Sequence, residues 1–466
     1  MNGSKKGNVA EQVRRFRARF VQSAGVALGT VITGQLLKTT VLAEAGCWRE
    51  RLYGPFTTVV LFTEQVLGAD HSCQDAVARG LSARVALGQA PCSLNTGPYC
   101  KARLRLALGL IEQLGRAVGM RLSAAQPAPW LWRGRNVKLV DGTTVSMPDT
   151  VANQEAFPQS REQKPGLGFP LARLAGIISL SCGAVLEWAS GPCEGKNTGE
   201  TALLWRLMDK FADGDVVIAD RYFASYFGIA RLRQQGVDVL IRQHQRRHTD
   251  FRRGRHLGKR DHVVSWARPL RPNWMDWATY ATMPESMLMR EVRVGDLTLV
   301  TTLLDAHEVG KPELVDLYGK RWQIELDFRS IKTVMQMDVL RCKSPDMVRK
   351  EIAVHLLAYN LVRTIMAQAA CFAHVLPRQL SFKATLQVLN AFEENLRFCP
   401  RGRLTTRHAI VLVGIGQLIL PVRPDRVEPR AVKRRPKPHK LLTKPRRVWR
   451  EQLRRQQQRH LKCALR

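Results

Sequence analysis

The segment at residues 318–332 constrains the fold of this chain more than any other, because it sets a polar strip beside an apolar stripe at helical spacing. At about 100° per residue, a strip only about 60° wide carries one acid among three side chains suited to phosphate: Tyr318, Arg321, Glu325 and Lys332. The apolar stripe beside it holds Leu317, Ile324, Phe328, Ile331 and Met335. A helix with this pattern packs along its apolar edge and leaves the polar edge to face a site. The alternative is an ordinary surface helix with spaced charges.

The chain carries a large excess of positive charge. Its 466 residues hold 73 Lys plus Arg against 39 Asp plus Glu, a formal net charge of +34. Such an excess attracts polyanions, which makes nucleic acid the expected partner and an anionic membrane the weaker candidate. The interaction should weaken with salt. At this length the chain can form two or three domains with a substantial core.

Cysteine spacing and hydropathy bear on the compartment. The ten cysteines show no CxxC or Cys/His zinc spacing, which indicates reduced thiols in a cytosol-like compartment. Residues 20–37 come closest to a membrane span, but four side chains make them too polar: Gln22, Thr30, Thr33 and Gln35. We therefore expect an amphipathic or poorly ordered N-terminal helix, a soluble protein and no membrane partner.

Changes of periodicity divide the chain into six regions. Residues 1–130 are mainly helical after a polar start and are expected to bind DNA. Residues 131–235 form the first part of a core, with predicted strands at 136–141, 174–181, 184–189 and 215–220, and helices at 198–211 and 222–235. Residues 236–295 predict a β-rich insertion of short strands, basic loops and Trp-containing turns.

The remaining regions return to the core and then leave it. Residues 296–370 combine a strand at 297–304 with the helix at 318–332 and an apolar helix at 352–370. Residues 371–420 predict a helical C-terminal region. Residues 421–466 form a basic tail with 17 Lys or Arg against 3 acids, little of which can pack into a core.

Two further acids are candidates to join Glu325. Asp141 and Asp220 each follow a predicted strand, and strand ends are where rigid scaffolds present catalytic groups. Taken singly, Asp141 also suits an Asp-Gly turn, and Asp220 could pair with Arg221. Together, the three carboxylates could hold Mg²⁺ or Mn²⁺, the hard cations that take oxygen ligands and serve phosphate chemistry in pairs.

The polar strip resembles a known signature. The spacing Tyr318-(2)-Arg321-(3)-Glu325-(6)-Lys332 resembles, without gaps, the Tyr-Arg-Glu-Lys signature of the insertion-sequence-4 DDE transposases. Residues 140–143 and 215–223 resemble the first and second Asp motifs of that family. Further similar segments lie at 92–103, 355–363 and 433–438, so the resemblance runs from about residue 60 to about 448.

The resemblance implies a mixed α/β fold with a ribonuclease-H-like core, interrupted by the β-rich insertion between Asp220 and Glu325, and flanked by helical terminal regions. It also implies that Asp141, Asp220 and Glu325 hold two Mg²⁺ or Mn²⁺ ions. These would support nicking at the element's ends and attack by the freed 3′-hydroxyl, through a hairpin in related elements. The implied partners are double-stranded DNA, as terminal inverted repeats and target, and a second copy of the chain. The implied location is the bacterial cytoplasm, at the nucleoid.

Other residues are candidates to bind the DNA. Tyr318, Arg321 and Lys332 suit phosphate contacts, or alternatively support their helix through salt bridges. Trp274 and Trp277 could stack on a flipped base, or alternatively pack inside the β-rich unit. A basic stretch at 242–260 suits the duplex backbone, or alternatively forms a solvated loop; it includes Arg246, Arg247, Arg252 and Arg253. The basic tail is a further DNA-binding candidate.

Two competing functions remain open at this point. A catalytically silent or domesticated DNA-binding derivative would keep the basic surfaces without the chemistry, and the intact acids weigh against it. A plain metal-dependent nuclease of the same fold would hydrolyse without strand transfer. The Tyr, Arg and Lys around Glu325 weigh against the nuclease, since hydrolysis alone needs no grip on a retained end.

Overall fold

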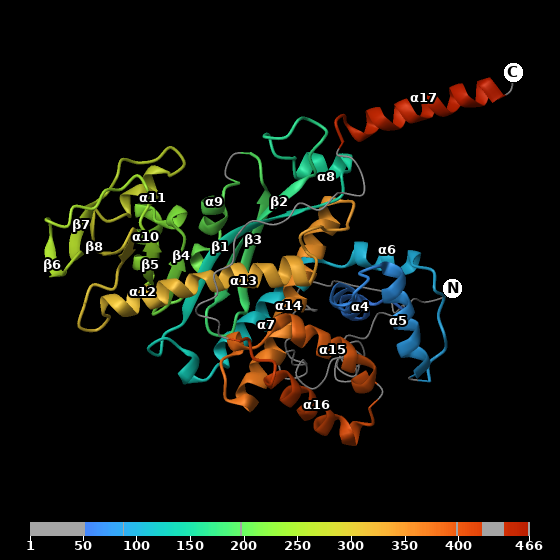
Figure 1. The fold of residues 1–466 in the computed structure, drawn as a ribbon, viewed down its shortest axis with the longest axis horizontal. Coiled ribbons are helices and arrows are strands. Elements are labelled where there is room, and N and C mark those ends of the chain that lie inside the picture. Colours follow the sequence, from blue (N-terminus) through green and yellow to red (C-terminus); the bar gives the residue numbers. More distant parts are fainter. Residues whose placement is uncertain (1–51, 87, 196–197, 398, 422–441, 465–466) are drawn as a thin grey trace.

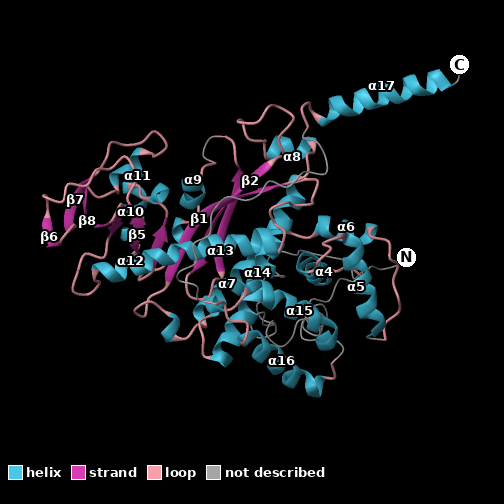
Figure 2. Cartoon of the chain, in the orientation of Figure 1, coloured by secondary structure: helices cyan, strands magenta, loops and turns pink. Residues whose placement is uncertain are grey.

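The computed structural model describes residues 52–86, 88–195, 198–397, 399–421 and 442–464 (Figure 1). The N-terminal helix expected around residues 20–37 lies outside the described residues, as does the tail from 422 to 441. Helices and strands of the described part are arranged around one central sheet (Figure 2).

Nine strands of the described residues form a mixed sheet in the order β3-β2-β1-β4-β5-β9-β8-β7-β6. The first five in sequence are β1 (Val137–Ser146), β2 (Leu171–Ser179), β3 (Val185–Pro192), β4 (Val216–Ala219) and β5 (Asp238–Arg242). β2 pairs antiparallel with both β1 and β3, whereas β1, β4 and β5 run parallel. This is a ribonuclease-H-like core, so the predicted mixed α/β fold class is confirmed.

Alternation along the central strands separates two cores. Leu139 of β1 and Ile218 of β4 are fully buried on one face, with residues of α7 (Leu108–Ala124) and α14 (Pro345–Ala373). Val140 and Val217 face the other way and are buried with residues of α9 (Glu200–Trp205) and α10 (Tyr226–Gln234). Since successive strand residues point to opposite faces, a strand covered on both sides is apolar throughout.

The β-rich insertion extends this sheet instead of forming a separate one. It contains β6 (Arg255–Gly258), β7 (Asp261–Ala267), α11 (Trp277–Ala281) and β8 (Ser286–Val294), and β9 (Leu297–Thr301) pairs antiparallel with both β8 and β5. The expected start of the insertion at residue 236 is corrected, because β5 pairs in parallel with β4 and so belongs to the core. The five-residue strand runs directly into the basic loop, which hid its core character.

Helices make up most of the described parts of both flanking regions. The N-terminal region contains α4 (Pro55–Leu67), α5 (Cys73–Ala86), α6 (Gly97–Arg105) and α7. After α14 come α15 (Phe382–Arg397) and α16 (Arg401–Gly416), and α17 (Arg446–Ala464) extends away from the body of the molecule (Figure 1). A short α8 (Val151–Ala156) follows β1.

Two predicted helices of the core are shorter than their patterns. α9 ends at Trp205, where 198–211 was expected, and α10 begins only at Tyr226. The start of α10 is set by Ser225, whose hydroxyl accepts a hydrogen bond from the Gly228 N–H as an N-cap.

α14 is the one described helix that could cross a membrane by length and composition. Its most apolar stretch of 18 residues is 78% buried inside the molecule, because α7, α4 and α16 all pack against this helix. The helix is therefore apolar on nearly all sides for the reason that a central core helix is.

Candidate active site

Asp141 and Asp220 occupy matched positions on neighbouring parallel strands. The register pairs Val140 with Ala219, the residues that immediately precede the two acids. Since Leu139 faces the α14 side of the sheet, alternation directs Asp141, and by the same count Asp220, to that side. Both acids therefore face the helices that follow β9.

One detail of the sequence prediction is wrong. Asp141 does not end its strand, because β1 continues to Ser146 in antiparallel pairing with β2. Only the pairing with β4 stops at Val140. Asp220, in contrast, does follow the last residue of β4, and a 3₁₀ turn at Arg221–Phe223 comes directly after it. The two acids thus lie where neighbouring strands part, one in mid-strand and one at a strand end.

Glu325 lies on a helical run whose geometry changes along its length. α12 (Lys311–Gly319) leads through a 3₁₀ turn (Lys320–Trp322) into α13 (Gln323–Arg329), which continues as a π-helical turn (Ser330–Val334). The predicted packing edge is confirmed by four side chains that are at most 1% exposed: Leu317, Ile324, Ile331 and Met335. Short 3₁₀ and π segments inside helices often mark functional sites.

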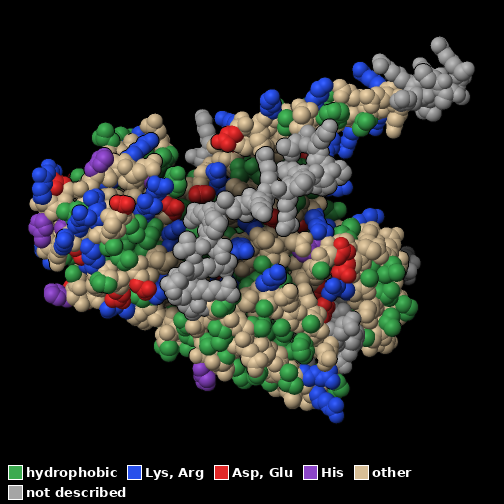
Figure 3. Space-filling view, in the orientation of Figure 1, with side chains coloured by type: hydrophobic (Ala, Val, Ile, Leu, Met, Phe, Trp, Pro, Cys, Tyr) green, Lys and Arg blue, Asp and Glu red, His purple; other side chains and the backbone are tan. Residues whose placement is uncertain are grey.

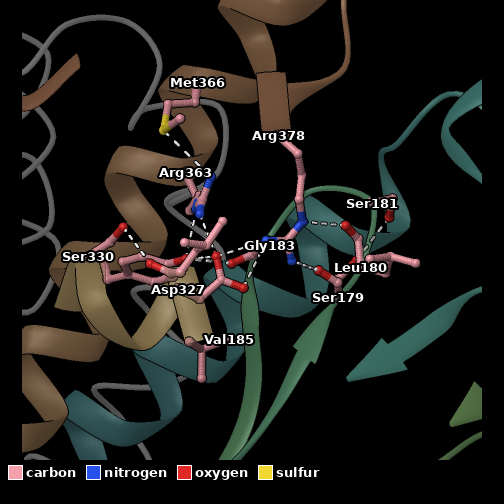
Figure 4. Close-up of polar contacts among 12 residues, drawn as sticks. Ser179, Leu180, Ser181, Gly183, Val185, Asp327, Ser330, Arg363, Met366 and Arg378 are labelled. Carbon is pink, nitrogen blue, oxygen red and sulfur yellow. Dashed lines mark hydrogen bonds and ion pairs between the residues drawn. The ribbon is translucent and has the colours of Figure 1, made fainter. Parts of the chain in front are cut away.

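Asp327 fastens this helix to the core (Figure 4). Two residues along a helix correspond to about 200°, so Asp327 lies on the side of α13 away from Glu325. Its buried carboxylate accepts hydrogen bonds from Arg363 Nη2 at 2.5 Å, Arg378 Nη1 at 2.9 Å and Tyr359 Oη at 2.9 Å. Arg378 also donates to the backbone carbonyls at the end of β2. α13 is therefore tied at one point to α14, to the segment after α14 and to the sheet, which gives Glu325 a fixed support.

Arg321 joins the helix to the first strand acid. Its guanidinium donates to Glu325 Oε1 at 2.9 Å and to Asp141 Oδ2 at 3.4 Å. The side chains of Arg321, Asp141 and Glu325 are 18%, 19% and 37% exposed, so this cluster is open to solvent on one side. One cation thus stands between two of the three acids.

The other two members of the signature lie beside this cluster. Burial raises the pKa of the Tyr318 hydroxyl, Arg321 opposes the shift and the negative charge of Asp220 adds to it. Lys332 Nζ donates to Thr143 Oγ1 at 3.1 Å, two residues beyond Asp141 and on the same side of β1. The four residues of the sequence signature and both strand acids therefore gather on one side of the sheet.

Burial raises the pKa of Asp141 to about 6. A hydrogen bond from the Gly142 N–H and the charge of Arg321 lower it, whereas the charges of Glu200 and Asp220 raise it further. A carboxylate in this position is stabilised by any additional positive charge that approaches it.

The three carboxylates match a divalent metal in residue type but do not form a closed site. Three carboxylates facing one side are the oxygen ligands that hard cations take. Within the described residues, however, no group of three or more His, Cys, Asp or Glu lies close enough to hold a metal ion. Arg321 forms ion pairs with both Asp141 and Glu325. The residues fit a divalent metal by type and by facing direction, and would have to close around it.

Arg242 is a site residue that the sequence pattern assigned only to the basic loop. The register pairs Ala219 with Ile241, so Arg242 lies next to Asp220 on the third parallel strand. Its side chain is exposed, and its charge acts on the Tyr318 hydroxyl. Its position directly after the buried residues Val239, Leu240 and Ile241, at the last position of β5, was the signal that could have identified it.

A groove of about 1190 Å³ opens on the side of α9 and of the turn after Asp220. It is lined by aromatic and basic side chains from α9, from that turn and from the loops of the insertion: Trp205, Arg206, Tyr222, His244, Arg246, Arg247, His248 and Trp274. Arg246, Arg247 and Trp274 were predicted to bind DNA, whereas Trp205 and Arg206 were not predicted.

Trp274 and Trp277, unlike the buried Trp266, are not packed in the interior of the insertion. Trp274 is 55% exposed and its ring centroid lies 5.2 Å from that of Trp205. Trp277 is 68% exposed at the start of α11, where it packs edge-on against Tyr280 outside the groove. The expected alternative of burial inside the β-rich unit is therefore wrong for both.

The four predicted arginines of the insertion divide into two pairs. Arg246 is exposed in the groove, whereas Arg247 stacks over the Trp266 ring at 3.6 Å and has its pKa lowered by burial. Arg252 and Arg253 lie outside the groove and form exposed ion pairs with Asp250. The four do not form one surface.

Comparison with known proteins assigns the chain to a family. The transposase DDE domain family matches residues 132–361, which include all three acids and the insertion. Transposase InsG of insertion sequence element IS4 from Escherichia coli K12 is 31% identical over 352 residues, covering 72% of this chain and 76% of InsG. This chain belongs to the IS4 family of DDE transposases. The transposase of IS421 from Escherichia coli is 35% identical over 74 residues, 16% of this chain and 20% of that one.

Membership of the IS4 family makes the protein a transposase, an enzyme that acts on DNA, as predicted. DDE transposases use divalent metal ions, in keeping with the carboxylate set. Among solved structures, a piggyBac transposase synaptic complex with hairpin DNA overlaps 91% of this chain and 90% of its own, with 10% identity and a TM-score of 0.41. A likeness at that score carries no argument about function.

Proposed function

We propose that this transposase cleaves DNA at the ends of its element and joins the freed 3′-hydroxyl to target DNA, with Asp141, Asp220 and Glu325 as the catalytic carboxylates. The observation that carries the proposal is the matched register of the two aspartates on parallel strands, facing the side from which Glu325 approaches. Arg321, in contact with Asp141 and Glu325, supports a common site.

The chemistry is a pair of displacements at phosphorus. Two Mg²⁺ or Mn²⁺ ions bound by the three carboxylates would activate the attacking oxygen and stabilise the leaving one. The side chains of the protein hold the DNA end: Arg321 offers a bidentate fork, Lys332 a point charge, and Tyr318 a hydroxyl or a ring. Because positioning and charge neutralisation supply most of the rate, no covalent protein intermediate is needed.

The 3′-hydroxyl first attacks the opposite strand and forms a hairpin, which is reopened before joining. Hairpin formation needs a distorted end, and an unstacked base is held by aromatic surfaces. The exposed ring of Trp274, in a groove beside the turn after Asp220, supports this route. Trp277 supplies a second exposed ring on the same insertion.

Basic surfaces away from the acids bind the duplex. Figure 3 shows Lys and Arg side chains over the insertion and along α17. Arg246 and Arg247 reach the groove, and Arg252 and Arg253 extend the same loop outward. α17 carries seven Lys or Arg and one acid in 19 residues, a composition suited to phosphate contacts. The protein works as a homodimer on two inverted repeats, in the bacterial cytoplasm at the nucleoid.

The test is an in vitro reaction on DNA carrying the element's terminal repeats. Wild-type protein with Mg²⁺ should give nicked, hairpin and joined products, and Glu325→Gln should bind the same DNA but give none. Trp274→Ala should nick at the normal rate and form fewer hairpins.

Three results would overturn parts of the proposal. Binding without any product from wild-type protein would identify a catalytically silent DNA-binding derivative. Nicks without joining would identify a plain nuclease. Joined products without a hairpin would confirm strand transfer but show that the reaction does not pass through a hairpin.

A further inference from the structure

The guanidinium of Arg321 occupies the space that a metal ion would share with the catalytic acids. Its Nη2 atom lies 2.9 Å from Glu325 Oε1, and its Nη1 atom lies 3.4 Å from Asp141 Oδ2. These are two of the three carboxylates that the proposed function assigns to the divalent cation. Arg321 is therefore the counter-ion of the site as the chain folds.

A guanidinium and a divalent cation compete for such oxygens. Mg²⁺ requires near-octahedral coordination at about 2.0–2.1 Å, which leaves no place between the same carboxylates for a guanidinium. The guanidinium cannot release its charge by losing a proton, because it stays protonated in proteins. Two cations held side by side would also repel. Arg321 has to move when a metal ion enters.

The local structure gives Arg321 a route out. It lies on the 3₁₀ turn (Lys320–Trp322) between α12 and α13, next to Trp322, which is 50% exposed. Its own side chain is 18% exposed, so part of it already reaches solvent. Tyr318 and Lys332, the other proposed phosphate contacts, lie on the same strip of the helix.

We propose that Arg321 is an exchangeable counter-ion: it neutralises Asp141 and Glu325 before metal binds, and it transfers to a phosphate of the DNA end when metal replaces it. This inference rests on the proposed function of the three acids. Its consequence is that metal and the DNA end bind cooperatively: metal frees the guanidinium to bind the DNA phosphate, and the DNA phosphate draws the guanidinium away from the carboxylates that bind the metal. By linkage, DNA must strengthen metal binding by the same factor by which metal strengthens DNA binding.

The test measures Mn²⁺ binding by calorimetry, with and without a terminal-repeat duplex, so that the readout does not depend on activity. Without DNA, Arg321→Gln should bind Mn²⁺ roughly tenfold more tightly than wild type, the scale of removing one charged hydrogen-bonded competitor. Arg321→Lys should lie between the two. The matched control is Arg329→Gln, which removes one charge from the same helix at an exposed position and should stay within about twofold of wild type.

The DNA-bound measurement completes the test. Wild-type protein should gain roughly fivefold or more in Mn²⁺ affinity from the duplex, as coupled sites do, and Arg321→Gln should gain less. If Arg321→Gln binds Mn²⁺ no more tightly than Arg329→Gln in the absence of DNA, the exchange proposal is wrong. If Arg321→Gln does not fold, an Mn²⁺ affinity of Arg321→Lys no higher than wild type decides against it.

Failure of the underlying function gives a different pattern. Asp141→Asn and Glu325→Gln should each lose Mn²⁺ binding if these acids hold the metal. Unchanged Mn²⁺ binding in both variants would overturn the metal site itself. Loss of binding in both, without tightening in Arg321→Gln, would overturn only the role of Arg321.

Discussion

Two neighbouring acids of α13, Asp327 and Glu325, each pair with arginine, but the two clusters differ in burial and in the number of donors around the carboxylate. Asp327 is fully buried and shared by Arg363 and Arg378, and Tyr359 adds a third donor. Glu325 is 37% exposed and, among the described residues, pairs with one cation, Arg321, which also reaches Asp141. The first cluster is complete within the protein, and the second is open.

The difference shows how one helix can carry a support and a reactive edge. Separating a buried pair leaves an uncompensated charge in a medium that cannot solvate it, so the Asp327 cluster resists exchange. A half-exposed pair is weaker and can be replaced by another ion. The Asp327 cluster thus holds α13 in place while the ion pair between Arg321 and Glu325 can be exchanged.

The largest expected effect is on catalysis at the open cluster. Glu325→Gln should lower the nicking rate by about 10⁴-fold, the scale of disabling one member of a catalytic carboxylate set. Its thermal unfolding should stay close to wild type, because the carboxylate is 37% exposed and not enclosed in the core. Rates from a gel-based nicking assay and melting curves from calorimetry check the two parts. Residual nicking within tenfold of wild type would remove Glu325 from the catalytic set.

The closed cluster should behave in the opposite way. Asp327→Asn leaves Arg363 and Arg378 buried without a counter-charge and should lower the free energy of unfolding by about 3–5 kcal/mol. Chemical denaturation measures the change. A loss below about 1 kcal/mol would mean that solvent reaches the cluster and that the contrast with Glu325 is overstated. Among molecules that remain folded, DNA binding should be retained.

Asp141 offers a test through pH. Its carboxyl has a raised pKa of about 6 in the folded protein against 3.8 in the unfolded chain, so the charged form is disfavoured by folding. The cost is absent below about pH 4, grows as pH rises through the window from 4 to 6, and is complete above it. Without metal, Asp141→Asn should therefore be more stable than wild type by up to about 3 kcal/mol above pH 6.

The control for this prediction is the same pair of proteins near pH 4, where the difference contributed by this group should vanish. Melting temperatures across pH 4 to 8 in a metal chelator provide the measurement. A stability difference that does not change with pH would show that burial of the Asp141 charge is not its cause.

A surface ion pair completes the series with the smallest effect on folding. Arg252 and Asp250 interact on the surface of the insertion, with the Arg side chain 90% exposed. Arg252→Ala should leave the melting temperature unchanged within error. It should also reduce the slope of DNA affinity against salt by about one ion, if this loop contacts phosphate. An unchanged slope would show that Arg252 does not contact a DNA phosphate, and that DNA binding by the insertion is confined to the groove.

Much of this organisation could be predicted from local patterns. The stripe through Ile324 and Ile331 predicted the buried edge of the helix, and the apolar run before Asp220 predicted a central strand. Both signals depend on neighbours within a few residues. The continuation of β1 beyond Asp141 was missed because Asp-Gly is a common turn, and pairing with β2 overrides that tendency.

Other features depend on contacts between distant parts of the chain. Arg321 and Asp141 are 180 residues apart, and Asp327 meets Arg378 across 51 residues. Nothing near Asp327 in the sequence distinguishes it from a solvated acid. Its burial follows from the docking of α13 on α14, which local patterns do not specify.

The sequence by itself determined which residue types are available at helical and strand spacing, and therefore the three acids, the polar strip and the family. Periodicity carries that information because side-chain direction follows from backbone geometry alone. Only the tertiary structure decided that Arg321 pairs with both Asp141 and Glu325. It also decided that the nearby Asp327 is held by two other arginines, from α14 and from the segment after it. The strength of each pair depends on burial and on the number of donors around it, and both are properties of packed elements, not of sequence neighbours.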